Sequence, residues 1–160
     1  LAINSRGMQY LNQCFATVLA EDKPGIDLVR RLGEEFIHFV RSRPQYFDTM
    51  IHCEALENMS PAEDGDLKET IREQERQNFA YMLRALQAGI QDGTIDSKFN
   101  PHSLAVQILA NVRGLTQLYH LQRKGHYGEL FQDMELHLED LFEESMNLMI
   151  DGMKSKTNRH

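Results

Sequence analysis

The sequence contains no tryptophan, only two cysteines and only four prolines. Cys14 and Cys53 lie far apart, and neither belongs to a C-x-x-C pair. Such sparse cysteine excludes a disulfide-rich scaffold and is typical of a cytoplasmic protein with reduced thiols. The sequence does not decide whether Cys14 and Cys53 form a disulfide.

Clustered positive charge is also missing, since the formal net charge is -7 and the sequence pI is about 5.5. A surface that binds DNA or RNA needs grouped Lys and Arg to displace counterions from phosphates. The longest basic cluster, Lys154, Lys156 and Arg159, is short and mixed with polar residues. The chain as given is therefore not expected to bind nucleic acid unaided. No apolar run approaches the length of a membrane span, and the first residues do not form a signal peptide.

The sequence has no alternating Val/Ile/Thr run that would predict a β-strand. Apolar residues instead recur at helical spacing along the chain, which predicts an all-α protein, an antiparallel bundle of about six helices. The length suits one domain with a single core over residues 1–151, followed by a disordered tail at 152–160. The predicted helices span residues 1–19, 26–40, 45–58, 66–92, 101–121 and 127–150.

The clearest signals lie between residues 79 and 121. Apolar side chains from Phe79 to Ile90 fall on one helical face, and Gly93 follows as a stop, because glycine readily takes the left-handed conformation that ends helices. Asn100 and Pro101 then predict a new helix, in which the Asn side chain caps free N–H groups and Pro occupies the first turn.

This stretch resembles the C-terminal domain of TetR-family transcriptional regulators. The resemblance covers roughly residues 15–149 and depends on the order of several short motifs. It implies an effector-binding and dimerisation domain of a repressor that reaches DNA only through an N-terminal helix-turn-helix. That element is absent from this chain and is expected before Leu1, which agrees with the abrupt helical start and the acidic charge. The matching residues are Leu86, Gly89, Ile90, Gly93, Asn100, Pro101, Ala105, Gly114 and Leu115, with Phe36, Phe39, Arg43, Pro44, Tyr46 and Phe47 upstream.

Apolar and aromatic residues from four predicted helices form either a filled core or a pocket. Methionine adapts to varied shapes, and a single polar side chain can orient a ligand. The resemblance favours a pocket for a small hydrophobic effector, with Tyr46, Met50, Phe79 and Tyr119 as the foremost contacts. The full predicted lining is Phe36, Phe39, Tyr46, Met50, Cys53, Phe79, Met82, Leu86, Val112 and Tyr119.

The last two predicted helices carry apolar residues on more than one face. A surplus apolar face needs a cover, and a two-fold copy of the same chain is the commonest one, so a homodimer is expected. Which stripe faces the partner stays open. The predicted interface comprises Ile108, Leu115, Leu118, Leu138, Leu141 and Phe142.

Two alternatives remain beside the regulator. Glu35 and His38 have the i, i+3 spacing of a helical-bundle metalloenzyme, but that site needs a second Glu-x-x-His, which the sequence lacks. There is also no nucleophile elbow or phosphate-binding glycine loop, so no enzyme activity, metal or cofactor is expected. The other alternative is a plain helical dimerisation module with a filled core and no ligand.

Overall fold

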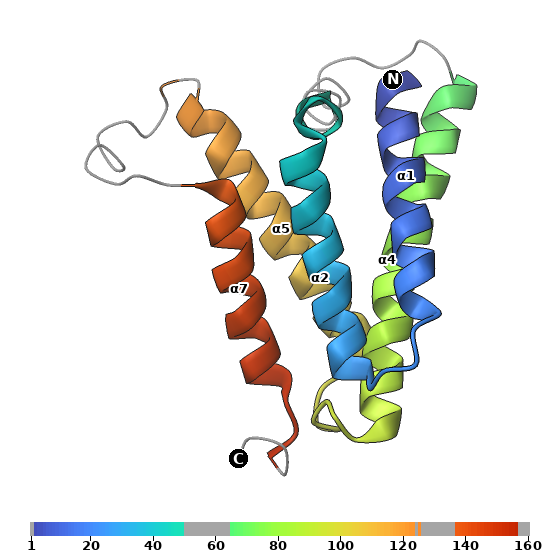
Figure 1. Ribbon diagram of the computed structural model, residues 1–160, viewed down its shortest axis with the longest axis vertical. Helices are drawn as coiled ribbons and strands as arrows, with labels where there is room; N and C mark the ends of the chain where they lie inside the picture. Colours follow the sequence, from blue (N-terminus) through green and yellow to red (C-terminus); the bar gives the residue numbers. More distant parts are fainter. Residues whose placement is uncertain (1, 50–64, 124, 126–136, 157–160) are drawn as a thin grey trace.

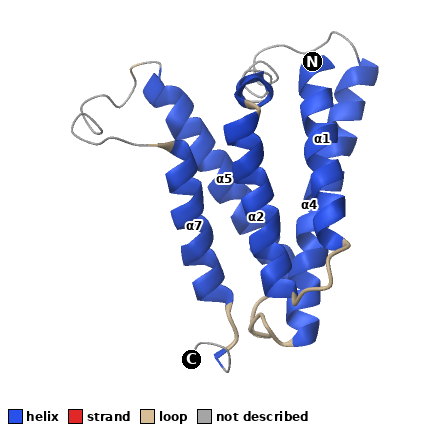
Figure 2. Ribbon diagram, in the orientation of Figure 1, coloured by secondary structure: helices blue, strands red, loops and turns tan. Residues whose placement is uncertain are grey.

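The structure is a computed structural model of the 160-residue chain, in which residues 2–49, 65–123, 125 and 137–156 are described. No strand occurs in these ranges, where helices joined by loops make up the fold (Figure 2). The prediction of an all-α bundle is confirmed. The helices are α1 (Ala2–Leu19), α2 (Gly25–Ser42), α4 (Gly65–Asp92), α5 (Pro101–Arg123) and α7 (Leu138–Met153), and residues 44–49 are also helical.

The helices run in alternating directions, and α2 lies at the centre of the bundle (Figure 1). Helix α2 packs against α1, α4 and α7, while α5 packs against α4 and α7. Helix α1 also lies along α4. The buried core therefore runs through all five helices, and its most completely enclosed large side chains include Leu32, Phe39, Leu86 and Ile150.

Local signals place the helix ends around α5 as predicted. The Asn100 side-chain oxygen accepts hydrogen bonds from the backbone N–H groups of His102 at 2.9 Å and Ser103 at 3.1 Å. Pro101 is the first helical residue. Gly93 and Gly125 have φ of +80° and +83°, a conformation that side chains with a Cβ rarely adopt. The predicted cap at Asn100 and the predicted glycine stop at Gly93 are confirmed.

The predicted last helix is interrupted at His137 and ends later than predicted. His137 is extended, with φ -107° and ψ 123°, so α7 begins at Leu138 rather than continuing from residue 127. Residues 126–136 lie outside the described residues, as do 50–58 of the predicted third helix. At its other end α7 continues to Met153, three residues beyond the predicted end at Ile150.

The predicted disordered tail is also wrong for residues 152–156. Met153 is 2% exposed, because it extends the buried stripe of α7 that includes Ile150. The backbone then pairs with the loop after α4. Asp96 N–H donates to the Met153 carbonyl at 2.9 Å, and Ser155 N–H donates to the Thr94 carbonyl at 3.1 Å. Residues 157–160 lie outside the described part of the chain.

The start of α2 and the end of α4 meet at unusually short range. A Cβ built on Gly25 would lie 1.9 Å from the Gly89 nitrogen and 2.2 Å from its Cα. The Asp92 carboxylate accepts a hydrogen bond from the Gly25 N–H at 2.7 Å and another from the Thr94 N–H at 3.0 Å. The backbone contact of Gly25 with Gly89 and the Asp92 carboxylate together join α2 to α4.

The Asp92 carboxylate also satisfies a donor that the helix leaves open, since the first N–H groups of α2 have no partner within the helix. Burial pushes the pKa of the Asp92 carboxyl up, but hydrogen bonds from Thr94 and from the Gly25 N–H outweigh this effect. The pKa therefore lies below its ordinary value, and the group stays ionised at neutral pH.

Replacing Gly25 by Ala tests this contact. The added Cβ meets the backbone of Gly89, so α2 and α4 must separate, and we expect the free energy of unfolding to fall by about 3 kcal/mol. Gly114→Ala is the matched control, because nothing lies within 4 Å of a Cβ at that helical position. It should raise the free energy of unfolding by about 0.5–1 kcal/mol. Urea unfolding measures both, and equal stabilities for the two variants would contradict the observed helix contact.

Candidate functional site

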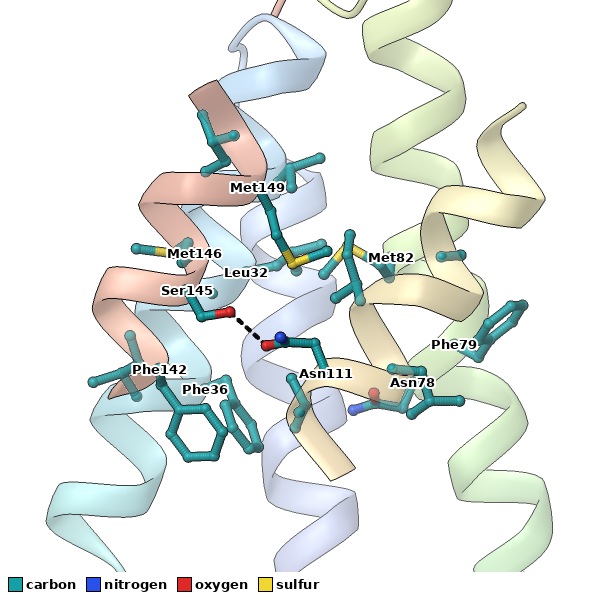
Figure 3. A pocket seen from close by; sticks show the side chains of 18 of the residues that line it. Leu32, Phe36, Asn78, Phe79, Met82, Asn111, Phe142, Ser145, Met146 and Met149 are labelled. Carbon is teal, nitrogen blue, oxygen red and sulfur yellow. Dashed lines mark hydrogen bonds between the residues drawn. The ribbon is translucent and has the colours of Figure 1, made fainter. Parts of the chain in front are cut away.

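A cavity of about 130 Å³ lies between α2, α4, α5 and α7 and also touches α1. It is the candidate site because residues far apart in the sequence converge on it (Figure 3). Its lining residues are Phe15 of α1; Val29, Leu32, Gly33, Phe36 and Ile37 of α2; Asn78, Phe79 and Met82 of α4; Ala105, Ile108, Leu109, Asn111 and Val112 of α5; and Phe142, Ser145, Met146, Met149, Ile150 and Met153 of α7.

Aromatic rings form one rigid part of this wall. Phe36 and Phe142 meet edge to face, with ring centroids 5.2 Å apart and planes at 77°. This geometry is the favourable one for aromatic pairs, and it joins α2 to α7 at one side of the cavity. Phe142 is almost fully buried, so this part of the wall is fixed by the core.

Methionines form the adaptable part of the wall. Met82 comes from α4, whereas Met146, Met149 and Met153 all come from α7. The missing side chain of Gly33 lets Met146 pack directly on α2, since a Cβ there would lie 2.3 Å from the Met146 sulfur. Unbranched thioether side chains change shape at low cost, so this wall can accommodate ligands of different outlines.

Among the described residues, three polar side chains line the cavity, and none of the lining residues carries a titratable group. The Ser145 hydroxyl donates a hydrogen bond to the side-chain oxygen of Asn111, which joins α7 to α5 across the cavity (Figure 3). The Asn78 side-chain nitrogen is buried and has no hydrogen-bond partner among the described residues. Such a wall is uncharged and suits an uncharged guest, because an unpaired charge is costly to bury.

The structure brings together four of the ten predicted ligand-contact residues, namely Phe36, Phe79, Met82 and Val112. Phe39 and Leu86 belong to the solid core instead, at 1% and 0% exposure. These two were wrongly assigned to the pocket, because helical periodicity does not separate core from cavity wall.

The other aromatic residues of the predicted pocket lie elsewhere. Tyr46 packs on Gly7, where a Cβ would lie 3.0 Å from the Tyr46 Cβ, and Arg43 lies over its ring. Tyr119 packs against the core as a half-buried side chain but is absent from the cavity wall. Met50 and Cys53 lie outside the described residues, and Cys14 is a free, half-buried thiol.

The six residues of the predicted dimer interface differ in how far they are buried within the subunit. Leu138 and Phe142 are buried within the subunit, and Ile108 is half-buried and lines the cavity with Phe142. Leu115 and Leu141 are half-buried, and Leu118 is 43% exposed. Three apolar side chains that were not predicted are exposed on the same two helices: Val106, Leu109 and Leu148.

Sequence reasoning missed six of the wall residues that matter most. Ser145, Met146, Met149 and Met153 were missed because α7 was assigned to the dimer interface and its end to a disordered tail. The i, i+3, i+4 spacing of Met146, Met149 and Ile150 was a usable signal for a buried face. Asn78 and Asn111 had a weaker signal, as amides beside the apolar positions Phe79 and Val112.

The metal-site alternative rests on Glu35 and His38. The Glu35 carboxylate accepts a hydrogen bond from the Arg31 guanidinium at 3.2 Å, and Arg31 also pairs with Glu21 at 3.1 Å and Glu34 at 3.0 Å. His38 is exposed. The described ranges contain no group of three or more His, Cys, Asp or Glu that could hold a metal ion.

Comparisons with known proteins bear on the fold alone. No family model matches the chain, and no curated protein matches it. The chain is similar to a solved structure of a protein with unknown function from Rhodococcus sp. RHA1, with a TM-score of 0.64 and 12% sequence identity. That similarity covers 96% of this chain and 72% of the other. Across the described helices, none combines the length and the hydrophobicity that crossing a membrane requires.

Filling the cavity tests whether it can hold a guest. Ala105 is 1% exposed and lines the void, so Ala105→Leu adds three carbons where there is space. We expect a change of less than about 1.5 kcal/mol in the free energy of unfolding. Benzene, which enters an engineered apolar cavity of about 150 Å³, should bind the wild-type protein and bind this variant at least about tenfold more weakly.

NMR titration of the methionine methyl groups measures this binding. Ala110→Leu is the control, because Ala110 is exposed on the same helix and is not part of the wall. Benzene binding that is equal in both variants would place its site elsewhere.

Proposed function

We propose that the chain is the ligand-sensing and dimerisation domain of a TetR-like transcriptional regulator, which acts as a repressor. The observation that carries the proposal is the uncharged cavity enclosed by α2, α4, α5 and α7, with methionines on two sides. The resemblance in the sequence supplies the regulatory context. The DNA-reading helices of such a regulator would precede residue 1, in agreement with the acidic charge of this chain.

The effector is a small, uncharged and largely apolar molecule. The lining residues offer no charge to pair with an ionised ligand. The void is near the size that accepts benzene, and Met146 and Met149 are the wall side chains that adjust to a larger effector. Their side chains are the most adaptable parts of the wall and belong to α7, so a bulky guest pushes on that helix first.

The mechanism is a ligand-biased equilibrium between two helix arrangements. The effector favours one arrangement only by the difference in its affinity for the two. A change from 1:99 to 99:1 requires about 5.5 kcal/mol of such difference. Because α7 packs on both α2 and α5, a displacement of α7 changes its contacts with both helices.

Two copies of the chain associate through the outer faces of α5 and α7. Leu118 on α5 and Leu148 on α7 are 43% and 75% exposed in the single subunit. Val106 and Leu109, earlier on α5, are 56% and 39% exposed, and Leu109 also lines the cavity. Exposed apolar side chains on two helices that pack together favour a covering partner. A two-fold copy of the same surface is the commonest such partner.

A charge inside the cavity tests the effector proposal. We expect Met82→Arg to abolish binding of uncharged aromatic compounds, because the guanidinium occupies the void and needs water. Phe79→Arg should act in the same direction. Gln87→Arg is the control on the exposed face of the same helix and should leave binding unchanged. Calorimetry measures the affinities, and a folded Met82→Arg protein with wild-type affinity would show that the pocket is misplaced.

Introducing two carboxylates on the exposed faces of α5 and α7 tests the proposed dimer interface. We expect Leu118→Glu combined with Leu148→Glu to convert a dimer into a monomer at micromolar concentration, because charges then face each other across an apolar interface. Gln13→Glu combined with Gln87→Glu adds the same charge on exposed positions of α1 and α4 and should remain dimeric. Sedimentation velocity distinguishes the species, and a monomeric wild-type chain would refute the proposed interface.

A further inference from the structure

The Asn78 amide is an unusual group in this cavity. It lies on α4 beside Phe79 and one turn before Met82, and all three residues line the wall. Its side-chain nitrogen is buried and makes no hydrogen bond with the described residues. Figure 3 shows this amide directed from α4 towards α5, on the side of the wall that faces the cavity.

The other polar pair of the wall is already engaged. The Asn111 side-chain oxygen accepts the Ser145 hydroxyl proton, and Asn111 is exposed. A solvent-exposed amide can exchange partners with water at little cost. A buried amide nitrogen such as that of Asn78 cannot, and its unpaired N–H is costly as long as nothing accepts it. Asn78 is therefore the polar group of the wall that gains most from a ligand.

We propose that Asn78 determines the specificity of the cavity by donating a hydrogen bond to an acceptor oxygen on an otherwise apolar effector. The ligand class is an uncharged ketone, aldehyde or ester of about benzene size or larger. The inference rests on the proposed ligand-sensing function and adds the chemical group that is recognised. A site built to hydrogen-bond a ligand discriminates strongly against the analogue without that group, because the buried partner is then left unpaired.

Two compounds of the same shape test this proposal. Acetophenone carries a carbonyl oxygen where α-methylstyrene carries a CH₂ group, so only the first can accept a hydrogen bond. Asn78→Leu removes the donor and keeps a side chain of similar size in an apolar wall. We expect it to weaken acetophenone binding at least about tenfold, equal to about 1.4 kcal/mol. The affinity for α-methylstyrene should stay within about twofold or increase, because burial of apolar surface is retained.

Gln87→Leu is the matched control, because it also replaces an amide by leucine on α4 but at an exposed position. It should change neither affinity. Calorimetry gives the four affinities, and far-UV circular dichroism verifies that each variant is folded.

A measurement on the wild-type protein keeps the test valid if Asn78→Leu fails to fold. The carbonyl ¹³C resonance of labelled acetophenone moves downfield when the oxygen accepts a hydrogen bond. In the complex it should lie downfield of its position in hexane. A resonance at the hexane position would overturn the inference.

The outcomes separate the two proposals. Equal loss of both compounds in Asn78→Leu, or no loss of either, overturns the role of Asn78 and leaves a ligand cavity in place. Failure of the wild-type protein to bind either compound overturns the proposed ligand function together with this inference.

Discussion

The contact between the backbones of Gly25 and Gly89 fixes the rest of the bundle. It brings the first turn of α2 against the last turns of α4 at a distance that only glycine permits. The Asp92 carboxylate then joins the same two elements by accepting the Gly25 N–H. Because the loop after Asp92 also pairs with Met153 and Ser155, the end of α7 is held at the same point.

This closed end explains where the cavity forms. Ile95 is buried beneath the loop, and Met153 at the end of α7 is buried as well, so both help to seal the bundle there. Further along, α7 meets α2 through the edge-to-face rings of Phe36 and Phe142. Between these two fixed points lies the void, and four methionines contribute to its wall.

The sequence allowed the helices and their caps to be predicted because these depend on neighbouring residues. Asn100 with Pro101 and the glycine at 93 act over a single turn, and the structure has each in its expected role. Contacts between helices could not be predicted in this way, because they depend on residues that are distant in the sequence. Phe39 and Phe142 have the same apolar character, yet one is in the solid core and the other forms the cavity wall.

The errors in α7 have the same physical origin. The end of α7 reads as a polar tail, because nothing local to Met153 indicates that the loop after α4 will pair with it. Similarly, the surplus apolar residues of α7 suggested a partner subunit, whereas Leu138 and Phe142 are buried by helices of their own chain. Asn78 was missed because a single amide beside a phenylalanine is common on any amphipathic helix.

The described side chains of the wall offer apolar contacts and three uncharged polar groups. No described residue of the lining can act as a general acid or base near neutral pH. The Ser145 hydroxyl donates its proton to an amide oxygen, which cannot remove it and so does not activate a nucleophile. The similarity to the Rhodococcus sp. RHA1 protein supports the bundle alone, since one fold can carry many functions.

The small size of the cavity limits the binding free energy that a guest can gain inside it. Binding energy has a ceiling of about 1.5 kcal/mol per heavy atom, so a six-atom guest gains at most about 9 kcal/mol. A guest that fits without displacing the wall binds both helix arrangements almost equally and shifts neither population. A ligand that moves Met146 and Met149, and with them α7, has different contacts in the two arrangements. Under the proposed function, the effective ligands are therefore those that bind the two helix arrangements unequally.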